Sequence, residues 1–167
     1  MLLYHGSSLV VDKPRLIEQT RGLDFGVGFY LTTKIEQARD FAEIIINRRK
    51  SGTPTINIYN FDEETAIKTL ELLYFPEPNG DWLEFIRDNR LNSYTGKQYD
   101  IIKGPVANDK VYPTLLALIS GQFNIEAALA AIKPYKLFDQ YCLATESALT
   151  LLTFKKAVKP QEVVIDD

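Results

Sequence analysis

Hydrophobic residues recur at helical spacing in the stretch that follows Thr33, where they all fall on one face: Ile35, Ala38, Phe41, Ala42 and Ile45. Residues three and four positions apart share one side of an α-helix, so this pattern indicates an amphipathic helix. Thr33 precedes the stretch, and Glu36 follows Thr33 by three positions, as in a capping box. The sequence therefore predicts a helix from about Lys34 to Arg49.

Short apolar runs predict strands between the helices, at Leu2 to His5, Phe29 to Thr32, Thr55 to Asn60, Tyr99 to Ile102 and Gln140 to Thr145. Further helices are expected after the capping residue Asp62 (with Ala66, Ile67, Leu70 and Leu73), at Asp81 to Arg90, at Pro113 to Ser120, from Asn124 through Ile132, and at Glu146 to Leu152. Val10 to Leu23 is polar and is expected to be a loop. This order predicts one α+β domain over residues 1–167, with a helical insert at about residues 62–92.

Composition agrees with a folded domain. Hydrophobic residues make up 46% of the 167 residues and charged residues 25%, which is typical of a globular chain and not of a disordered one. The length suits a single domain with its own core. The formal charge is −3, and no basic run is longer than Arg48-Arg49-Lys50, so nucleic acid is not the expected default partner.

Several kinds of site and location are disfavoured by the sequence. The single histidine, His5, and the single cysteine, Cys142, do not suffice for a usual zinc site, and no metal is expected. One cysteine also rules out an internal disulfide. No apolar run reaches the ~20 residues of a membrane-spanning helix, and the first residues lack the pattern of a signal peptide. We therefore expect a cytoplasmic protein with no membrane partner.

Two segments contain the residues that could take part in catalysis or ligand binding. In the first, Leu2-Leu3-Tyr4-His5-Gly6-Ser7-Ser8, the only histidine ends an apolar run and precedes a glycine and two hydroxyls. In the second, Asp24 to Thr33, Tyr30 lies on an apolar segment just after Gly26 and Gly28. Their order resembles the first two signature segments of the ADP-ribosyltransferases, on the side of that superfamily that includes diphtheria toxin and the poly(ADP-ribose) polymerases.

The resemblance implies an ADP-ribosyltransferase-like split β-sheet with flanking helices, and NAD as the co-substrate. It assigns His5 to a hydrogen bond with the adenosine ribose and the Gly6 backbone to the nicotinamide carboxamide, with Ser7 beside them in the NAD site. Tyr30 corresponds to the tyrosine of the second motif. Phe41 falls where the polymerase branch has a second ring-stacking tyrosine. Ala38 replaces a serine that bonds the carboxamide in that branch, so one contact is missing.

Gln140 departs from the family pattern. The late strand that begins there corresponds to the one that opens with the catalytic glutamate, so the resemblance makes Gln140 the catalytic position. A glutamine side chain can hydrogen-bond a ribose hydroxyl but has no charge with which to balance an oxocarbenium-like state. Such an electrostatic contribution is commonly worth roughly 3 kcal/mol, on the order of a hundredfold in rate. Glu146 is an alternative carboxylate, although its place at the start of a helix favours a surface charge.

Two more features have alternative interpretations. Phe138 precedes Gln140 in the turn that meets the protein substrate in many family members, and it is either such a contact or a packed aromatic residue. The segment from Tyr99 through Gly104-Pro105 to Asp109 resembles one in a bacterial family of uncharacterised transferase-like proteins that share the Tyr-His-Gly-Ser opening and the late Gln-Tyr strand. Asn108 and Asp109 either line the cleft or cap the next helix.

Three functional hypotheses follow. The first is an NAD-dependent mono-ADP-ribosyltransferase, of the kind found as toxins or effectors, which acts on a macromolecular acceptor and, as a toxin, implies a cognate antitoxin or other inhibitory protein. The second is an NAD-binding module of the same fold without transferase activity, which Gln140 and Ala38 favour. The third, a Ser-His hydrolase using Ser7 or Ser8, is disfavoured because no nucleophile-elbow motif is present. Gly26-x-Gly28 precedes a strand instead of a helix and so is no Rossmann fingerprint.

Overall fold

The computed structural model describes residues 1–18, 22–108 and 110–163. Its strands are β1 (Leu2–Ser7), β2 (Phe29–Leu31), β3 (Thr55–Phe61), β4 (Leu72–Tyr74), β5 (Ile101–Pro105), β6 (Asp139–Leu143) and β7 (Leu152–Val158). Its helices are α1 (Ile35–Arg49), α2 (Glu63–Thr69), α3 (Gly80–Arg90), α4 (Tyr112–Ile119), α5 (Ile125–Ile132), α6 (Glu146–Leu149) and a 3-10 turn, η1 (Pro160–Glu162).

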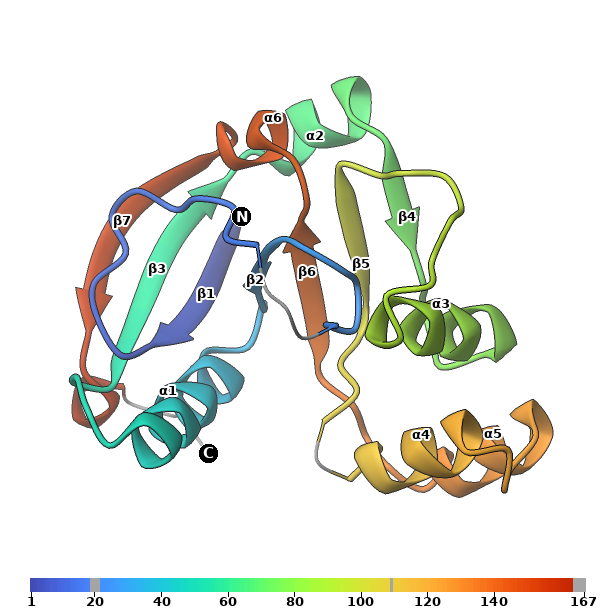
Figure 1. Cartoon of the computed structure of the whole chain (residues 1–167). Coiled ribbons are helices and arrows are strands. Elements are labelled where there is room, and N and C mark those ends of the chain that lie inside the picture. Colours follow the sequence, from blue (N-terminus) through green and yellow to red (C-terminus); the bar gives the residue numbers. More distant parts are fainter. Residues whose placement is uncertain (19–21, 109, 164–167) are drawn as a thin grey trace.

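The strands form two sheets (Figure 1). A three-stranded antiparallel sheet has the order β1-β3-β7, and a four-stranded sheet has the order β2-β6-β5-β4, in which only β4 runs parallel to its neighbour. The sheets are joined where Tyr4 and Thr32 exchange backbone hydrogen bonds of 2.9 and 3.0 Å. The mixed α/β architecture confirms the predicted α+β class.

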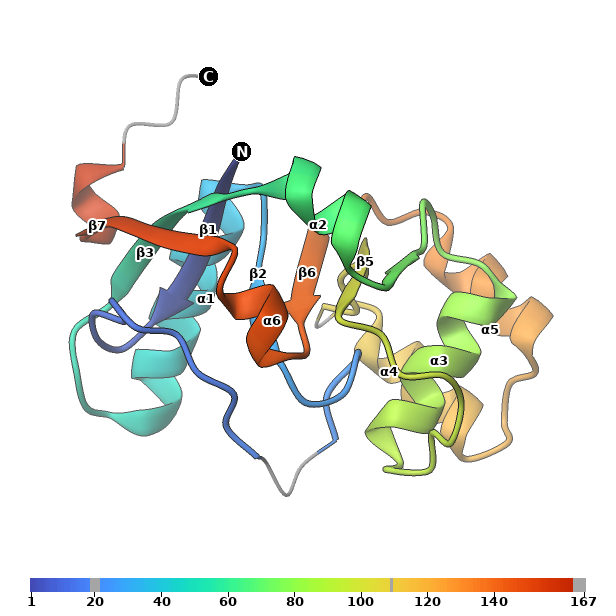
Figure 2. The same cartoon turned by 90° about the horizontal axis from the view of Figure 1, so that it is seen from above.

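Apolar side chains fill both faces of the four-stranded sheet. One core lies between the two sheets and includes Leu3, Tyr59 and Leu143. The other lies between the four-stranded sheet and helices α3, α4 and α5, and its centre is the fully buried Trp82. The Trp82 indole N–H donates to the Pro105 carbonyl at 3.0 Å, so α3 is fixed to the end of β5. The four-stranded sheet therefore lies between the two cores, with the three-stranded sheet on one side and helices α3, α4 and α5 on the other (Figure 2).

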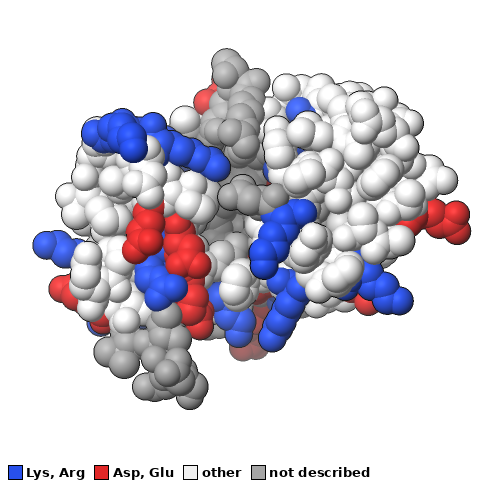
Figure 3. Space-filling view, turned by 90° about the horizontal axis from the view of Figure 1, so that it is seen from below, with Lys and Arg blue, Asp and Glu red and all other residues white. Residues whose placement is uncertain are grey.

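Helix α1 packs against the three-stranded sheet through its small residues. Ala38 and Ala42 are buried against β1, whereas Phe41 on the flank of the same helix is 48% exposed. Seen from below, charged side chains gather on the side of α1, and the side of α4 and α5 is almost uncharged (Figure 3). No described helix is both long enough and apolar enough to cross a bilayer.

The predicted strands and most helices are confirmed, with bounds shifted by a few residues. Asp62, Asn79 and Asn124 cap α2, α3 and α5 by accepting hydrogen bonds from backbone N–H groups three residues later. The capping box at Thr33 is wrong: the helix begins at Ile35, and the Thr33 hydroxyl donates to Asp139 at 2.8 Å instead. A tertiary partner has replaced the local one.

Two strands were missed. The helix after Asp62 ends at Thr69, and Leu73, which was assigned to it, lies in β4. The helix predicted for Glu146 to Leu152 ends at Leu149, and Leu152 begins β7. Because β4 belongs to the four-stranded sheet, the segment 62–92 is not wholly helical, and α3 from the same segment packs into the core beside β5.

Candidate functional site

His5 lies on β1 and is bound to the next sheet through a backbone contact. Its Nδ1 lies 2.8 Å from the Tyr30 carbonyl oxygen, which can only accept, so Nδ1 carries the hydrogen and the neutral ring presents Nε2 as an acceptor. The ring also lies against Phe29, with centroids 4.4 Å apart. Burial lowers the pKa of His5, and the hydrogen bond to Tyr30 opposes this only in part. The imidazole is therefore neutral at neutral pH.

Gly6 is required by the packing of α1. A Cβ atom at this position would lie 2.0 Å from the Ala38 carbonyl oxygen and 2.9 Å from the Ala42 nitrogen. Its backbone groups face away from β3, because Tyr4, two residues earlier, uses its own N–H and C=O on Thr32 and backbone direction alternates along a strand. No described residue pairs with the Gly6 N–H or C=O on that edge. One donor and one acceptor are thus left side by side.

The Ser7 hydroxyl is used in hydrogen bonds within the protein. Its hydroxyl donates to the Leu9 carbonyl and accepts from the Leu9 N–H and from the Asn57 amide, both at 3.2 Å. Asn57 is fully buried and also accepts from the Val11 N–H at 2.8 Å. These bonds hold the turn that follows β1, and they occupy the hydroxyl that the resemblance assigned to NAD.

Tyr30 ties β2 to the preceding loop. Its hydroxyl donates to the Gly26 carbonyl at 2.6 Å and accepts from the Phe25 N–H at 3.0 Å. Burial raises the pKa of Tyr30 well above its usual value, so the phenol stays protonated and keeps both hydrogen bonds. Tyr30 pairs across the strands with Cys142, so their side chains are on one face of the sheet.

Gln140 lies two residues before Cys142 and therefore on the same face of β6 as Cys142 and Tyr30. It is buried, and its amide nitrogen makes no hydrogen bond with any described residue. The side chain is nevertheless close enough to the Asp24 carboxylate to favour the charged form of that group. An unpaired buried donor costs free energy, and the attraction of the Asp24 carboxylate offsets part of that cost.

Asp24 and Arg90 form a buried ion pair behind Gln140. The Arg90 Nε and a terminal guanidinium nitrogen lie 2.6 and 2.5 Å from one Asp24 oxygen, and both side chains are at most 15% exposed. Burial raises the pKa of Asp24, while Arg90, Gln140 and the Ala107 N–H oppose the shift. Neither residue was singled out from the sequence, because the two are 66 positions apart and no local pattern links them.

Asp139 fixes the start of α1 against β6. One carboxylate oxygen accepts from the Thr32 hydroxyl at 3.2 Å, the Thr33 N–H at 3.3 Å and the Thr33 hydroxyl at 2.8 Å. The Lys34 N–H donates to the Thr32 hydroxyl at 3.1 Å. The residue before Gln140 therefore connects the end of β2 to the first turn of α1.

Most of the remaining predicted residues are exposed. Phe41 is exposed on α1, and Glu146 is exposed at the first position of α6, beyond the opposite end of β6 from Gln140. Phe138 is 41% exposed, and its carbonyl accepts from the Val106 N–H at 2.9 Å. The Asn108 carbonyl accepts from the Val111 and Tyr112 N–H groups, but the N-cap position of α4 is Val111 and the Asn108 side chain does not cap the helix; Asp109 lies outside the described residues.

The fold thus joins His5 to Tyr30 directly and puts Tyr30 and Gln140 on one face of a sheet. The model of one protein family, described as "Protein of unknown function (DUF3990)", matches residues 1–154. No curated protein and no solved structure gave a significant match.

Proposed function

The chain belongs to the DUF3990 family, and we propose that it is an NAD-dependent mono-ADP-ribosyltransferase. In this reaction the bond between nicotinamide and ribose breaks, nicotinamide leaves as a neutral molecule, and a nucleophilic atom of a macromolecular acceptor bonds to the anomeric carbon and loses its proton. The observation that carries the proposal is the neutral His5 acceptor next to the unpaired backbone groups of Gly6.

The backbone of Gly6 has the hydrogen-bonding groups that a carboxamide requires. An unpaired N–H suits the carboxamide oxygen, and an unpaired C=O suits its NH2 group, as in any pair of amides. The two sheets are bridged at Tyr4 and Thr32, and Tyr4 lies two residues before Gly6. This arrangement is compatible with the split β-sheet that the resemblance implies. Nicotinamide would thus be bound through the backbone, and the missing serine at Ala38 removes one contact without removing this pair.

His5 supports binding of a ribose hydroxyl. Its Nε2 has to act as an acceptor, because Nδ1–H is used on the Tyr30 carbonyl. A ribose hydroxyl can donate to this nitrogen, and the lowered pKa of His5 keeps the acceptor available at neutral pH. The Phe29 ring fixes the imidazole plane, so little side-chain entropy is lost on binding.

Gln140 sets the expected rate. The amide N–H, which is buried in the free protein, can donate to a ribose hydroxyl oxygen once NAD binding makes this side chain accessible to the sugar. It supplies no negative charge to the oxocarbenium-like state, and the Asp24 carboxylate behind it is neutralised by Arg90. Loss of one electrostatic contribution of this kind lowers rates on the order of a hundredfold. We therefore propose slow transfer of single ADP-ribose units.

The test measures NAD binding and nicotinamide release separately. Wild-type protein is titrated with NAD in a thermal-shift assay, and nicotinamide is quantified by chromatography in the presence of a cell lysate and labelled NAD. We expect a saturable rise in melting temperature, slow release of nicotinamide and label on an acceptor. A thermal shift with release at background would favour the NAD-binding module that Gln140 and Ala38 suggest. Absence of both signals would contradict both proposals.

Two variants make the assay specific. His5→Phe keeps an aromatic ring against Phe29 but removes both ring nitrogens, so we expect a folded protein whose melting temperature no longer responds to NAD. Phe154→Leu is the control, because it alters another aromatic contact, with Tyr59 at 5.8 Å, outside the proposed site. Its response to NAD should equal that of the wild type.

A further inference from the structure

We propose that the groove between α2 and strands β4, β5 and β6 of the four-stranded sheet is a binding site for a small carboxylate with an apolar body. The sheet forms its floor through β4, β5 and β6, and α2 forms one wall, around a cavity of about 180 Å³. The groove is on the opposite face of the sheet from Gln140, because Tyr141 lines it and neighbours along a strand point to opposite faces. The inference is therefore independent of NAD binding.

Most of the groove is apolar and accessible to a ligand. Ile101 and Phe61 line its buried part, whereas Ile67 on the wall and Leu72 on the floor are 62% and 40% exposed. Covering such side chains removes apolar area from water, at about 25 cal/mol per Å². A short aliphatic or aromatic group is thus favoured here over a polar one.

A lysine supplies the polar end of the groove. Lys103 on β5 projects from the row of side chains that it forms with Tyr74 and Tyr141, its neighbours on β4 and β6. Its Nζ lies 5.1 Å from the Tyr74 ring centre and 4.8 Å from that of Tyr141. The two rings hold the ammonium over the groove by cation–π attraction without using its hydrogens.

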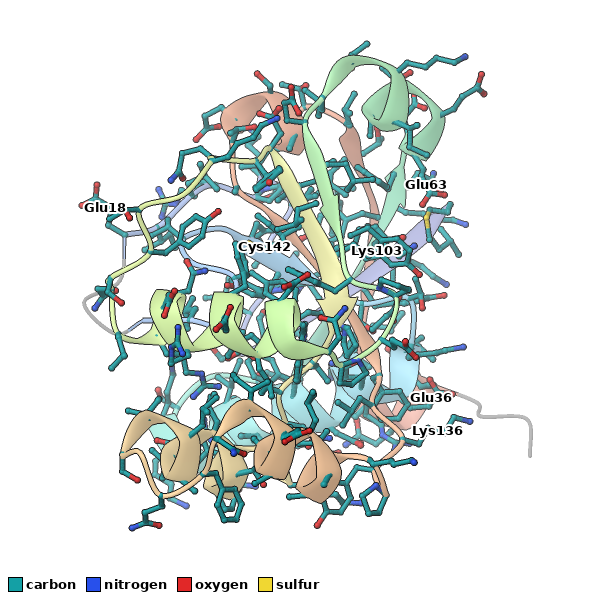
Figure 4. The ribbon with its side chains drawn as sticks, turned by 90° about the vertical axis from the view of Figure 1, so that its right-hand side faces the viewer. Glu18, Glu36, Glu63, Lys103, Lys136 and Cys142 are labelled. Carbon is teal, nitrogen blue, oxygen red and sulfur yellow. The ribbon has the colours of Figure 1, made fainter. Side chains whose placement is uncertain are left out.

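The ammonium group forms a long ion pair with Glu63 but no hydrogen bond with a described residue, so its donors are unused. Its nearest carboxylate oxygen, on Glu63, is 3.9 Å away and already accepts from the Tyr141 hydroxyl at 3.1 Å. Figure 4 shows Glu63 and Lys103 at this end of the groove, from the start of α2 and from β5. Lys103 makes no hydrogen bond to any residue that the structure describes, although an ammonium has three donors.

The free donors favour an anion as the ligand. A carboxylate can approach Lys103 from the groove and form a charge-assisted hydrogen bond, which is stronger than a neutral one. A cationic ligand would instead meet the charge of Lys103, which already occupies the faces of Tyr74 and Tyr141. Glu63 is at the rim and 40% exposed, so its charge is partly screened by water.

The experiment uses hexanoate as the probe and the full-length protein with labelled isoleucine methyl groups. Ile67 and Ile101 line the groove and report binding by NMR. We expect saturable shifts of both methyl signals, with a Kd of about 1 mM for a ligand of this size. Hexanamide, which has the same shape without the charge, should bind roughly tenfold more weakly, and acetate should cause no saturable shift.

Three variants complete the test. Lys103→Met removes the charge and keeps the length of the side chain, so hexanoate should bind it no better than hexanamide does. Lys97→Met is the matched control, because Lys97 also lies over a tyrosine ring, that of Tyr99, but outside the groove; its affinity should equal that of the wild type. Ile67→Glu, at an exposed position, should fold and repel hexanoate, with Ile101 as reporter.

The proposal is overturned by any of three results. These are the absence of saturable methyl shifts with hexanoate, equal binding of hexanoate and hexanamide to the wild type, and unchanged hexanoate affinity in both Lys103→Met and Ile67→Glu. None of these outcomes depends on whether the protein binds NAD.

Discussion

A single hydrogen bond defines the chemistry of His5. Donation from Nδ1 to the Tyr30 carbonyl fixes the tautomer, and burial disfavours the imidazolium form. The folded-state pKa of His5 is therefore below that of the unfolded chain, so the unfolded state binds more protons as the pH falls below about 6.5. The contribution of His5 to stability is full above that pH and is lost progressively below it.

This linkage predicts a pH dependence that can be isolated, because His5 is the only histidine. Between pH 7.5 and 5.5, the free energy of unfolding of the wild type should fall more than that of His5→Phe. The difference should grow by at most about 1.4 kcal/mol per pH unit below pH 6.5. Urea denaturation at a series of pH values measures it, and parallel curves for the two proteins would contradict the neutral, partly buried imidazole.

Gly6 is constrained by space. Gly6→Ala puts a methyl group 2.0 Å from the Ala38 carbonyl oxygen, which forces α1 away from β1. We expect a loss of about 1–3 kcal/mol in urea denaturation, as for other overpacked sites. Gly80→Ala is the control: its Cβ would meet only Ile125, at 3.5 Å, so that variant should be as stable as the wild type or more stable. Equal stability of the two variants would refute the close contact.

Gln140 is the position at which a substitution tests catalysis. Gln140→Glu introduces the carboxylate that the ADP-ribosyltransferase resemblance places at this position, so under the proposed function nicotinamide release should rise, by up to roughly a hundredfold. Burial and the nearby Asp24 carboxylate both favour the protonated form of the new side chain, so the gain should increase with pH. Chromatographic assay of nicotinamide from pH 6 to 9 measures the effect. An unchanged rate at every pH, with NAD binding retained, would favour the binding module over the transferase.

The junction of β2, α1 and β6 shows how one element is fixed by another. The predicted capping box failed because Thr33 uses its hydroxyl on Asp139 instead of on its own helix. Three donors converge on that carboxylate oxygen, so the entry of α1 is fixed by a strand more than 100 residues away. Such a contact sets where the helix begins, which local spacing does not reveal.

Asp139→Ala should therefore destabilise the protein by about 1–3 kcal/mol, because the Thr33 N–H and hydroxyl lose their acceptor and the Thr32 hydroxyl keeps only Gln37 as an acceptor. Asp40→Ala is the matched control, since the Asp40 side chain is 56% exposed and, among the residues that the structure describes, bonds only to the neighbouring Arg39. That change should remain within about 0.5 kcal/mol of the wild type. Chemical denaturation compares them, and equal losses would mean that the junction contributes nothing.

The whole molecule is held together by contacts that join distant segments. The ion pair between Asp24 and Arg90 connects the loop before β2 to α3, which comes from the segment 62–92. Trp82 of the same helix is fully buried and bonds to the end of β5. The segment 62–92 is thus part of the common core and contributes both a strand and a helix to it.

A double-mutant cycle tests this connection. Arg90→Met leaves the Asp24 carboxylate buried without its partner and should cost about 3–5 kcal/mol. Adding Asp24→Leu removes the stranded charge, so the double variant should be more stable than Arg90→Met alone. Strictly additive losses in urea denaturation would show that the two side chains do not interact.

The sequence alone determined the elements that depend on neighbours a few residues apart. The helices after Asp62 and Asn124 were predicted because their caps and apolar stripes are local, the helix at Asp81 to Arg90 was predicted from its apolar stripe without its cap at Asn79, and a resemblance to known motifs pointed to His5, Tyr30 and Gln140. The missed strands β4 and β7 are short or half-exposed, and each exists only through pairing with a strand from elsewhere in the chain.

Only the tertiary structure decided which chemistry each side chain has. The tautomer of His5 follows from a partner 25 positions away, the Ser7 hydroxyl is occupied partly by Asn57, 50 positions away, and the charge of Asp24 is paired with Arg90, 66 positions away. Hydrogen bonds and ion pairs act over a few ångströms in space, and sequence separation does not limit them once the chain is folded. A sequence pattern contains only the neighbours of a residue along the chain. The pKa and the free hydrogen-bond donors of that residue depend on all of its neighbours in space.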